Sequence, residues 1–170
     1  MTILGYVFTF LNYLLYCVSR FCKEKYQMLA LDLLAKAAFI MGLACMGSLS
    51  GAFSMLVLSM ALIFAFVKEK KSHRWGPLYV IFQILLSYVM MAGFDGISSV
   101  FVFLSTSIAL IAVWWMPPQK MRIAGVAGNV FTLMYQISIQ NWAGLCELIV
   151  MSSNLSAYVK YHKAVKYRYL

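Results

Sequence analysis

Long apolar runs separated by short polar connections are the feature that most constrains the fold of this chain. Hydrophobic residues make up 64% of its 170 residues and charged residues only 11%, whereas about 25% of an average soluble domain is charged. Each run is close to the roughly 20 residues that an α-helix needs to cross a bilayer, and none has the strict alternation of a membrane β-strand. We therefore predict a bundle of transmembrane helices.

Seven apolar runs predict seven transmembrane helices. They lie at residues 3–19, 27–47, 51–67, 76–93, 97–116, 121–139 and 143–160. The first run lacks the basic start and small-residue cleavage site of a removable signal peptide, so we predict that it is a retained helix. No long polar segment separates the runs. The chain is thus predicted to be an all-α integral membrane protein without a soluble domain.

Lys and Arg residues fall in every second connection between the predicted helices. They are Arg20, Lys23, Lys25, Lys68, Lys70, Lys71, Arg74, Lys120, Arg122, Lys160, Lys163, Lys166 and Arg168. The connections at 46–50, 94–96 and 140–142 contain neither residue. Because basic loops are retained in the cytoplasm, this pattern predicts an outside N-terminus and a cytoplasmic C-terminus. The net charge of +9 is then explained by loops at the lipid surface and does not indicate nucleic acid.

A weak internal repeat appears when residues 1–70 are laid on residues 94–163 at a constant shift of 93 positions. Lys36 then falls on Asn129, and the basic connections coincide. Each unit holds three helices, and the single helix between them gives both units the same orientation, so the repeat is parallel. Chance matching of apolar helices is the alternative. We divide the chain into repeat 1 (1–70), a linker with the fourth helix (71–96), and repeat 2 with a basic tail (97–170).

Asp32 and Lys36 stand one turn apart inside the second predicted helix, and therefore on one face. A charged group at membrane depth costs at least about 2.5 kcal/mol on insertion scales, so it normally faces the bundle interior or a wet cavity. The two residues are the first candidates for a binding site. The alternatives are that they neutralise each other, or that Asp32 is wet near the cytoplasmic surface.

Polar side chains at helical spacing form stripes on two later helices and extend the candidate site. The stripes contain Asn129, Thr132 and Gln136 in the sixth helix, and Glu147, Asn154 and Tyr158 in the seventh. The stripes line a cavity if the two units pack face to face; the alternative is interhelical hydrogen bonding without a ligand. The predicted substrate-binding residues are Lys36, Asn129, Glu147, Asn154, Asp32, Gln136, Asn12 and Trp114.

Motifs of catalysis and metal binding are not found. The sequence has no GxxxxGK[ST] phosphate loop, no GxSxG elbow and no HExxH pair. Its four cysteines form no CxxC pair, and its two histidines lie in basic connections. We therefore predict no enzyme, no metal and no cofactor.

Two segments carry a resemblance to a known family. Gly-Ser-Leu-Ser-Gly-Ala at 47–52 precedes the third predicted helix, and Gln-Asn-Trp-Ala-Gly at 140–144 precedes the seventh. In these segments the chain resembles the YgjV-type family of small bacterial inner-membrane proteins, which implies an inner-membrane location. The arrangement of three, one and three helices is also similar to that of SWEET, PQ-loop and PnuC-type carriers. That similarity implies a solute held at mid-membrane by paired residues of the two units, here Lys36 and Asn129.

The main functional hypothesis is a small-solute transporter or facilitator that works by alternating access. Rocking of residues 1–70 against 94–163 would expose a central site to each side in turn. Lys36 would attract a carboxylate or phosphate, and Asp32 or Glu147 would carry a coupling proton. The alternative is a non-catalytic membrane subunit or scaffold with a partner membrane protein or a second copy of the chain.

Overall fold

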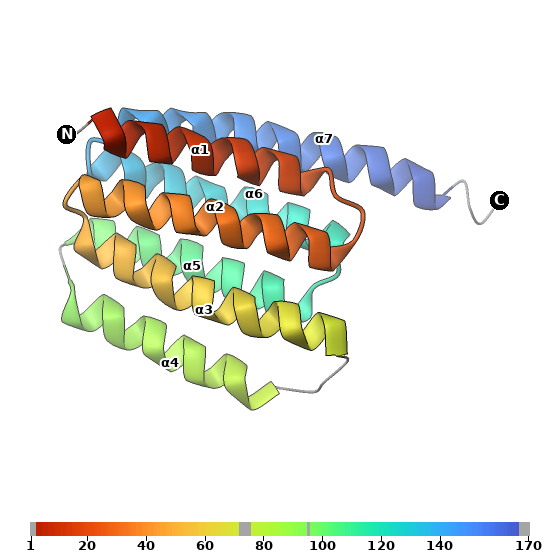
Figure 1. Cartoon of the computed structure of the whole chain (residues 1–170), viewed down its shortest axis with the longest axis horizontal. Coiled ribbons are helices and arrows are strands. Elements are labelled where there is room, and N and C mark those ends of the chain that lie inside the picture. The colour runs from red at the N-terminus through yellow and green to blue at the C-terminus, as the bar shows by residue number, and fades with distance from the viewer. Residues whose placement is uncertain (1–2, 72–75, 95, 167–170) are drawn as a thin grey trace.

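A computed structural model describes residues 3–71, 76–94 and 96–166, and the regular secondary structure of this part of the chain is entirely helical (Figure 1). The elements are α1 (Ile3–Arg20), α2 (Lys25–Cys45), α3 (Leu49–Lys71), α4 (Gly76–Ala92), α5 (Ile97–Trp115), α6 (Pro118–Ser138), the short 3₁₀-helix η1 (Trp142–Cys146) and α7 (Glu147–Lys166). Each predicted apolar run coincides with one α-helix, apart from the start of the last, which η1 precedes. Arg74 and Arg168, which were predicted to lie in cytoplasmic connections, are outside the described residues.

Glycine and proline set the ends of several helices. Gly47, between α2 and α3, has φ +78°, and Gly96, before α5, has φ +70°. Both lie in the left-handed region that glycine enters without a Cβ penalty. Pro118 starts α6, where its missing N–H costs nothing and its fixed φ suits a helix. These residues keep the connections short, so consecutive helices pack as neighbours.

Six of the helices close a ring. Neighbours along the chain pack together within α1, α2, α3 and within α5, α6, α7, and the two groups meet where α3 packs on α5 and α1 packs on α7. α4 lies outside the ring against α3 and α5, at the lower edge of Figure 1. The parallel repeat at 1–70 and 97–170 stays a prediction, as does the linker at 71–96. The order of the helices around the ring is compatible with the parallel repeat.

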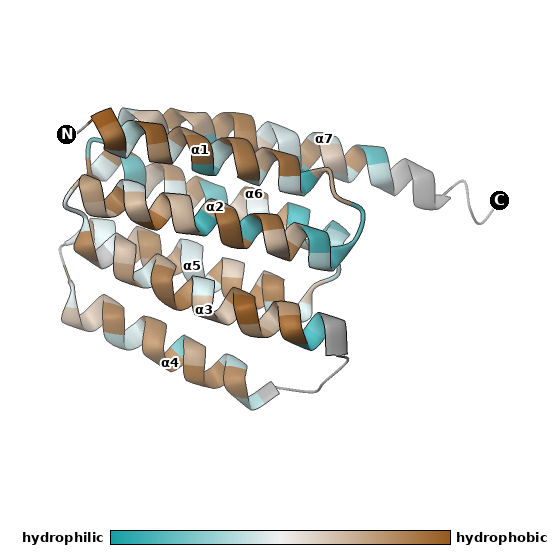
Figure 2. Cartoon of the chain, in the orientation of Figure 1, coloured by the Kyte–Doolittle hydropathy of each residue, from teal (hydrophilic) through white to brown (hydrophobic). Residues whose placement is uncertain are grey.

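The outer surface of the bundle is apolar along most of its length (Figure 2). Leu14, Ile84 and Met91 are among many large apolar side chains that are exposed there. Hydrophilic residues gather at the end of the bundle that holds the α1–α2 connection (Figure 2). An exposed apolar belt with polar residues at its end is typical of a protein whose solvent is lipid.

Four described helices are long and apolar enough to cross a membrane by length and composition. They are Ile3–Arg20, Lys25–Cys45, Gly51–Glu69 and Ile97–Trp115. The apolar part of α4, Pro77–Ala92, is shorter, and α6 and α7 contain more polar residues, several of them buried. The structure thus supports an all-α membrane protein, and the crossing of all seven helices stays a prediction.

Candidate functional site

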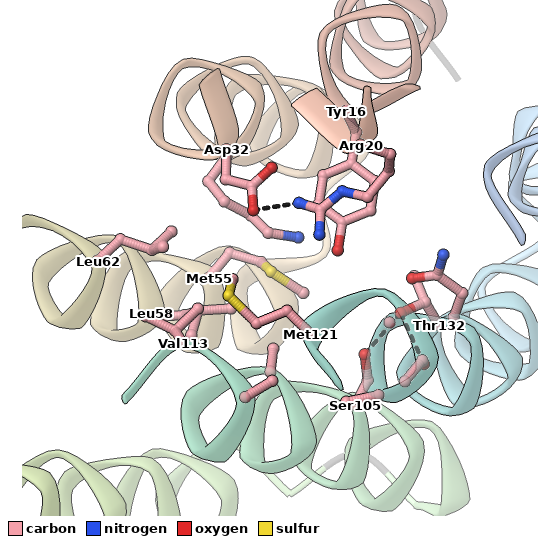
Figure 3. Close-up of a pocket in the computed structure, with 17 residues that line it drawn as sticks. Tyr16, Arg20, Asp32, Met55, Leu58, Leu62, Ser105, Val113, Met121 and Thr132 are labelled. Carbon is pink, nitrogen blue, oxygen red and sulfur yellow. Dashed lines mark hydrogen bonds and ion pairs between the residues drawn. The ribbon is translucent and has the colours of Figure 1, made fainter. Parts of the chain in front are cut away.

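A small chamber lies inside the ring, between α1, α2, α3, α5 and α6 (Figure 3). It has a volume of about 40 Å³ open to the centres of water molecules. A single buried water needs about 10–15 Å³ on that scale, so the chamber has room for a few waters or a very small ion. A sugar or a vitamin would not fit unless the helices moved apart.

The chamber has polar walls and an apolar floor. Tyr16 and Arg20 of α1 and Asp32 and Lys36 of α2 form one wall. Ser105 of α5 and Asn129 and Thr132 of α6 form the other, and the floor consists of Met55, Leu58, Leu62, Val113 and Met121. In Figure 3 the labelled residues of the two polar walls lie across the chamber from each other. A site of this kind orients a solute by a few polar groups among apolar contacts.

A buried ion pair joins α1 to α2 at one edge of the chamber. The guanidinium of Arg20 binds the carboxylate of Asp32, and their side chains are 2% and 5% exposed. Ser19 also donates its hydroxyl to Asp32. The prediction that Arg20 is a loop residue was wrong, since it ends α1 with its side chain buried. Asp32 therefore pairs directly with Arg20 and not with Lys36.

Lys36 enters the chamber as a cation without a direct counterion. No carboxylate within the described residues forms an ion pair with it. Its ammonium group lies 5.3 Å from the ring centroid of Tyr16 and 5.5 Å from that of Phe39. These aromatic faces stabilise a cation by about 0.5–2 kcal/mol, which does not replace an anion. The chamber therefore has an open electrostatic position for a negatively charged group.

Asn129 supplies a second open donor from the facing helix. Its side chain is 7% exposed, and its Nδ2 has no hydrogen-bond partner among the described residues. Ser105 and Thr132, which also line the chamber, are already hydrogen-bonded to each other at 2.6 Å. The structure thus brings the predicted residues Lys36, Asn129 and Asp32 to one chamber. Their part in solute binding stays a prediction.

Five other predicted site residues do not line the chamber. They are Asn12, Trp114, Gln136, Glu147 and Asn154. Trp114 packs against Phe82 of α4 at 6.2 Å between ring centroids, so it binds the linker helix to the ring. Asn154 packs on α6, where a Cβ at Gly125 would lie 3.1 Å from its Oδ1. Asn154 was predicted from the polar stripe of the seventh helix and Trp114 as an aromatic residue near the membrane surface, and neither side chain lines this chamber.

Asn12, Gln136 and Glu147 are involved in a second polar region, where η1 packs on α1 and α6. Gln136 accepts a hydrogen bond from Asn141 at 2.8 Å. The Oδ1 of Asn12, the hydroxyl of Tyr13 and the Nε2 of Gln136 are buried without a hydrogen-bond partner among the described residues. Glu147, the first residue of α7, is 4% exposed. Gln136 lies one helical turn beyond Thr132 of the chamber wall, but the region does not line the chamber.

Arg122 was predicted to be a charged residue of a loop, and this prediction was wrong. Its side chain is buried and binds the end of α1. It lies in α6, is 1% exposed, and donates to the carbonyls of Arg20 at 3.0 Å and Cys22 at 2.7 Å. Its guanidinium lies 4.7 Å from the ring centroid of Tyr161, which itself donates to the carbonyl of Phe21. These contacts satisfy carbonyls at the end of α1 that a helix leaves unpaired. They tie α6 and α7 to α1.

Replacing Arg122 with Ala should lower the free energy of unfolding by about 2 kcal/mol, since hydrogen bonds to charged groups contribute about 1.5–3 kcal/mol. Thermal unfolding of the detergent-purified protein measures the change. Lys120→Ala is the matched control, because Lys120 belongs to the same helix and is exposed. Equal melting temperatures for the two variants would show that the hydrogen bonds of Arg122 do not stabilise the fold.

A helical bundle with an apolar exterior and a buried polar centre belongs to the class of helical membrane proteins. Within this class, a family model described as bacterial inner membrane protein, Imp-YgjV, matches residues 3–165. The chain belongs to this family of bacterial inner membrane proteins, as its resemblance had indicated. No curated protein and no solved structure matches it. The likeness to SWEET, PQ-loop and PnuC-type carriers stays a prediction.

Proposed function

We propose that this protein is a small-solute transporter or facilitator with its binding site in the central chamber. The observation that carries the proposal is the pair of open donors on facing helices, the ammonium of Lys36 on α2 and the amide of Asn129 on α6. Unpaired polar groups in a membrane interior are costly, and they commonly mark solute or ion pathways. If Lys36 and Asn129 served only to hold the helices together, we would expect both donors to have hydrogen-bond or ion-pair partners within the protein.

The chemistry of these donors favours a solute that accepts hydrogen bonds and carries negative charge. Lys36 offers a positive charge, and Asn129 and the Tyr16 hydroxyl offer hydrogen bonds from either side. Asp32 does not repel such a solute strongly because Arg20 neutralises it. A carboxylate or phosphate group fits this arrangement best.

The ring of helices supports a proposal of alternating access. The chamber lies between the helices of residues 1–70 and those of 94–163, so a rocking motion between these units opens it to one side or the other. We propose seven membrane crossings, with the N-terminus outside and the C-terminus in the cytoplasm, on the basis of the basic connections. The contacts of Arg122 and Tyr161 with α1 then lie at the cytoplasmic end, and they would close that side.

The test is a thermal-stability screen of the detergent-purified protein against carboxylates, phosphates, sugars, nucleosides and vitamins. A ligand at about 100 times its dissociation constant should stabilise the protein by about 2.7 kcal/mol. We expect hits among anions, and we expect Lys36→Met to abolish them. Lys23→Met, at an exposed position in the α1–α2 connection, is the control and should keep them. Hits that Lys36→Met leaves unchanged would refute the site.

Solute transport is then measured in proteoliposomes with the anion that gave the strongest shift. Uptake should fall at least about tenfold in Lys36→Met, because losing one charged hydrogen bond of about 1.5–3 kcal/mol corresponds to that factor or more. Lys23→Met should transport at the unaltered rate.

A second candidate is a non-catalytic subunit or scaffold for another membrane protein or a second copy of the chain. It is favoured by the small chamber, since about 40 Å³ holds only a few waters. Under this proposal no solute in the screen stabilises the protein, and a defined partner copurifies from native membranes in mild detergent.

A further inference from the structure

The charged side chains that line the central chamber carry one more positive than negative charge. Arg20 and Lys36 are cations, and Asp32 is an anion. Asp32 is committed to Arg20, because the two form an ion pair in which both side chains are almost completely buried. The charge of Lys36 is left over, since no described carboxylate forms an ion pair with it. One negative charge in the chamber would balance Lys36, whereas a dianion would leave a buried excess, which is costly.

Hydrogen-bond donors reach the chamber from three different helices. Lys36 contributes its ammonium group from α2, and Asn129 contributes its Nδ2 from α6, an atom that is buried without a hydrogen-bond partner among the described residues. Tyr16 of α1 points its hydroxyl into the chamber (Figure 3). An oxyanion, which carries several acceptor atoms around one charge, can bind donors on different sides at once. A dipolar solute cannot place its ammonium group, because Asp32, the only carboxylate among the described lining residues, is paired.

The volume of the chamber limits the size of this oxyanion. About 40 Å³ is open to the centres of water molecules, and a single water needs about 10–15 Å³ on that scale, so the chamber holds about three or four atoms of that size. Met55 and Leu58 of the apolar floor are each 1% exposed, so packed side chains close the chamber on this side. Formate and nitrite have three non-hydrogen atoms and are small enough. Propionate and inorganic phosphate have five and are too large.

We propose that the central chamber binds a monovalent oxyanion of about three or four non-hydrogen atoms, such as formate or nitrite. Lys36 balances its charge, and Asn129 and Tyr16 donate to its oxygen atoms from the other helices. Met55 and its neighbours on the floor exclude larger anions. This inference rests on the proposed function, and it adds the charge, the shape and the size of the solute.

The first test is the binding of radiolabelled formate to the detergent-purified protein, with unlabelled nitrite, propionate and inorganic phosphate as competitors. We expect nitrite to compete about as well as formate. Propionate and phosphate should compete at least about tenfold more weakly, because their additional atoms overpack the chamber. Asn129→Leu keeps a side chain of similar size but removes the donor, so it should weaken formate binding at least about tenfold. Gln27→Leu, at an exposed position of α2, is the control and should bind formate normally.

The second test changes the size limit. Met55→Ala removes most of a side chain from the floor of the chamber, so we expect the preference for formate over propionate to fall at least about tenfold. Met60→Ala is the control, because Met60 lies in the same helix and is 42% exposed. It should keep the preference of the wild type. Thermal unfolding shows whether each variant is folded, and the competition series of the wild type decides alone if Met55→Ala is not.

Three results would overturn the inference. They are propionate or phosphate competing as well as formate, formate binding that Asn129→Leu leaves unchanged, and stabilisation of the protein by larger solutes only. In the first and third cases the protein still binds a solute, and the transporter proposal stands. If neither formate nor any solute of the thermal-stability screen binds, the inference and the proposed function fail together.

Discussion

Asp32→Asn should lower the free energy of unfolding by about 3–5 kcal/mol, because it leaves the guanidinium of Arg20 buried without its counterion. The two side chains are 2% and 5% exposed, so the guanidinium has almost no contact with bulk water that could replace the lost carboxylate. Reversible unfolding in mixed micelles of detergent and dodecyl sulfate, followed by tryptophan fluorescence, measures the change. The reverse substitution, Arg20→Met, leaves Asp32 unpaired and should cost a similar amount.

The double variant Arg20→Met and Asp32→Leu separates pairing from packing. Replacing both partners of a buried pair by apolar residues is often nearly neutral, so we expect most of the stability to return. Glu69→Gln breaks the Lys25–Glu69 pair, whose atoms are 3.3 Å apart but whose carboxylate is 40% exposed. Such a pair contributes about 0–1 kcal/mol. If Asp32→Asn cost no more than Glu69→Gln, the central pair would not be buried as the structure shows.

Gly144→Ala should lower the free energy of unfolding by about 3 kcal/mol, the upper end of the usual cost of overpacking. Gly144 lies in η1 against α6, and an added Cβ would overlap the Cβ of Gln136 and lie 2.8 Å from its Cγ. The Cβ of Gln136 is bonded directly to the backbone, so no side-chain rotation moves it away and α6 or η1 must shift. The same unfolding assay measures the loss.

Gly128→Ala is the matched control for Gly144→Ala. A Cβ at Gly128 would meet its nearest neighbour at 3.7 Å, which is an ordinary van der Waals contact. Gly128 lies inside α6, where alanine is favoured over glycine by about 1 kcal/mol, so this variant should be unchanged or more stable. Equal losses at the two positions would mean that η1 does not pack on Gln136 as described.

The positions of the helices were predictable from the sequence because lipid imposes a simple rule. A segment in the membrane must satisfy its own backbone hydrogen bonds, so it forms a helix of a length that the bilayer sets. The lengths of the apolar runs therefore place each described α-helix within a few residues of its observed bounds, and Gly47, Gly96 and Pro118 lie at the helix ends. The start of α7 was missed, since a 3₁₀ turn and an α-helix share the same apolar composition.

Part of the candidate site was predictable for a similar reason. A charge in the middle of an apolar run must find a polar interior, and this rule led to Asp32 and Lys36, both of which line the chamber. The aligned position Asn129 lines it too. The rule does not distinguish the faces of a helix that is polar on more than one side, and Asn154, which was included through its polar stripe, does not line the chamber.

The sequence by itself therefore determined the class of protein, the number of helices and the presence of a polar interior, because these depend on local composition and on the thickness of the bilayer. Only the tertiary structure decided the partners. An arginine at the end of an apolar run can extend into a basic loop or fold back between helices, and nothing local separates the two. Packing decided that Arg20 neutralises Asp32, that Arg122 holds the end of α1, and that Lys36 is left facing the chamber without a counterion in contact.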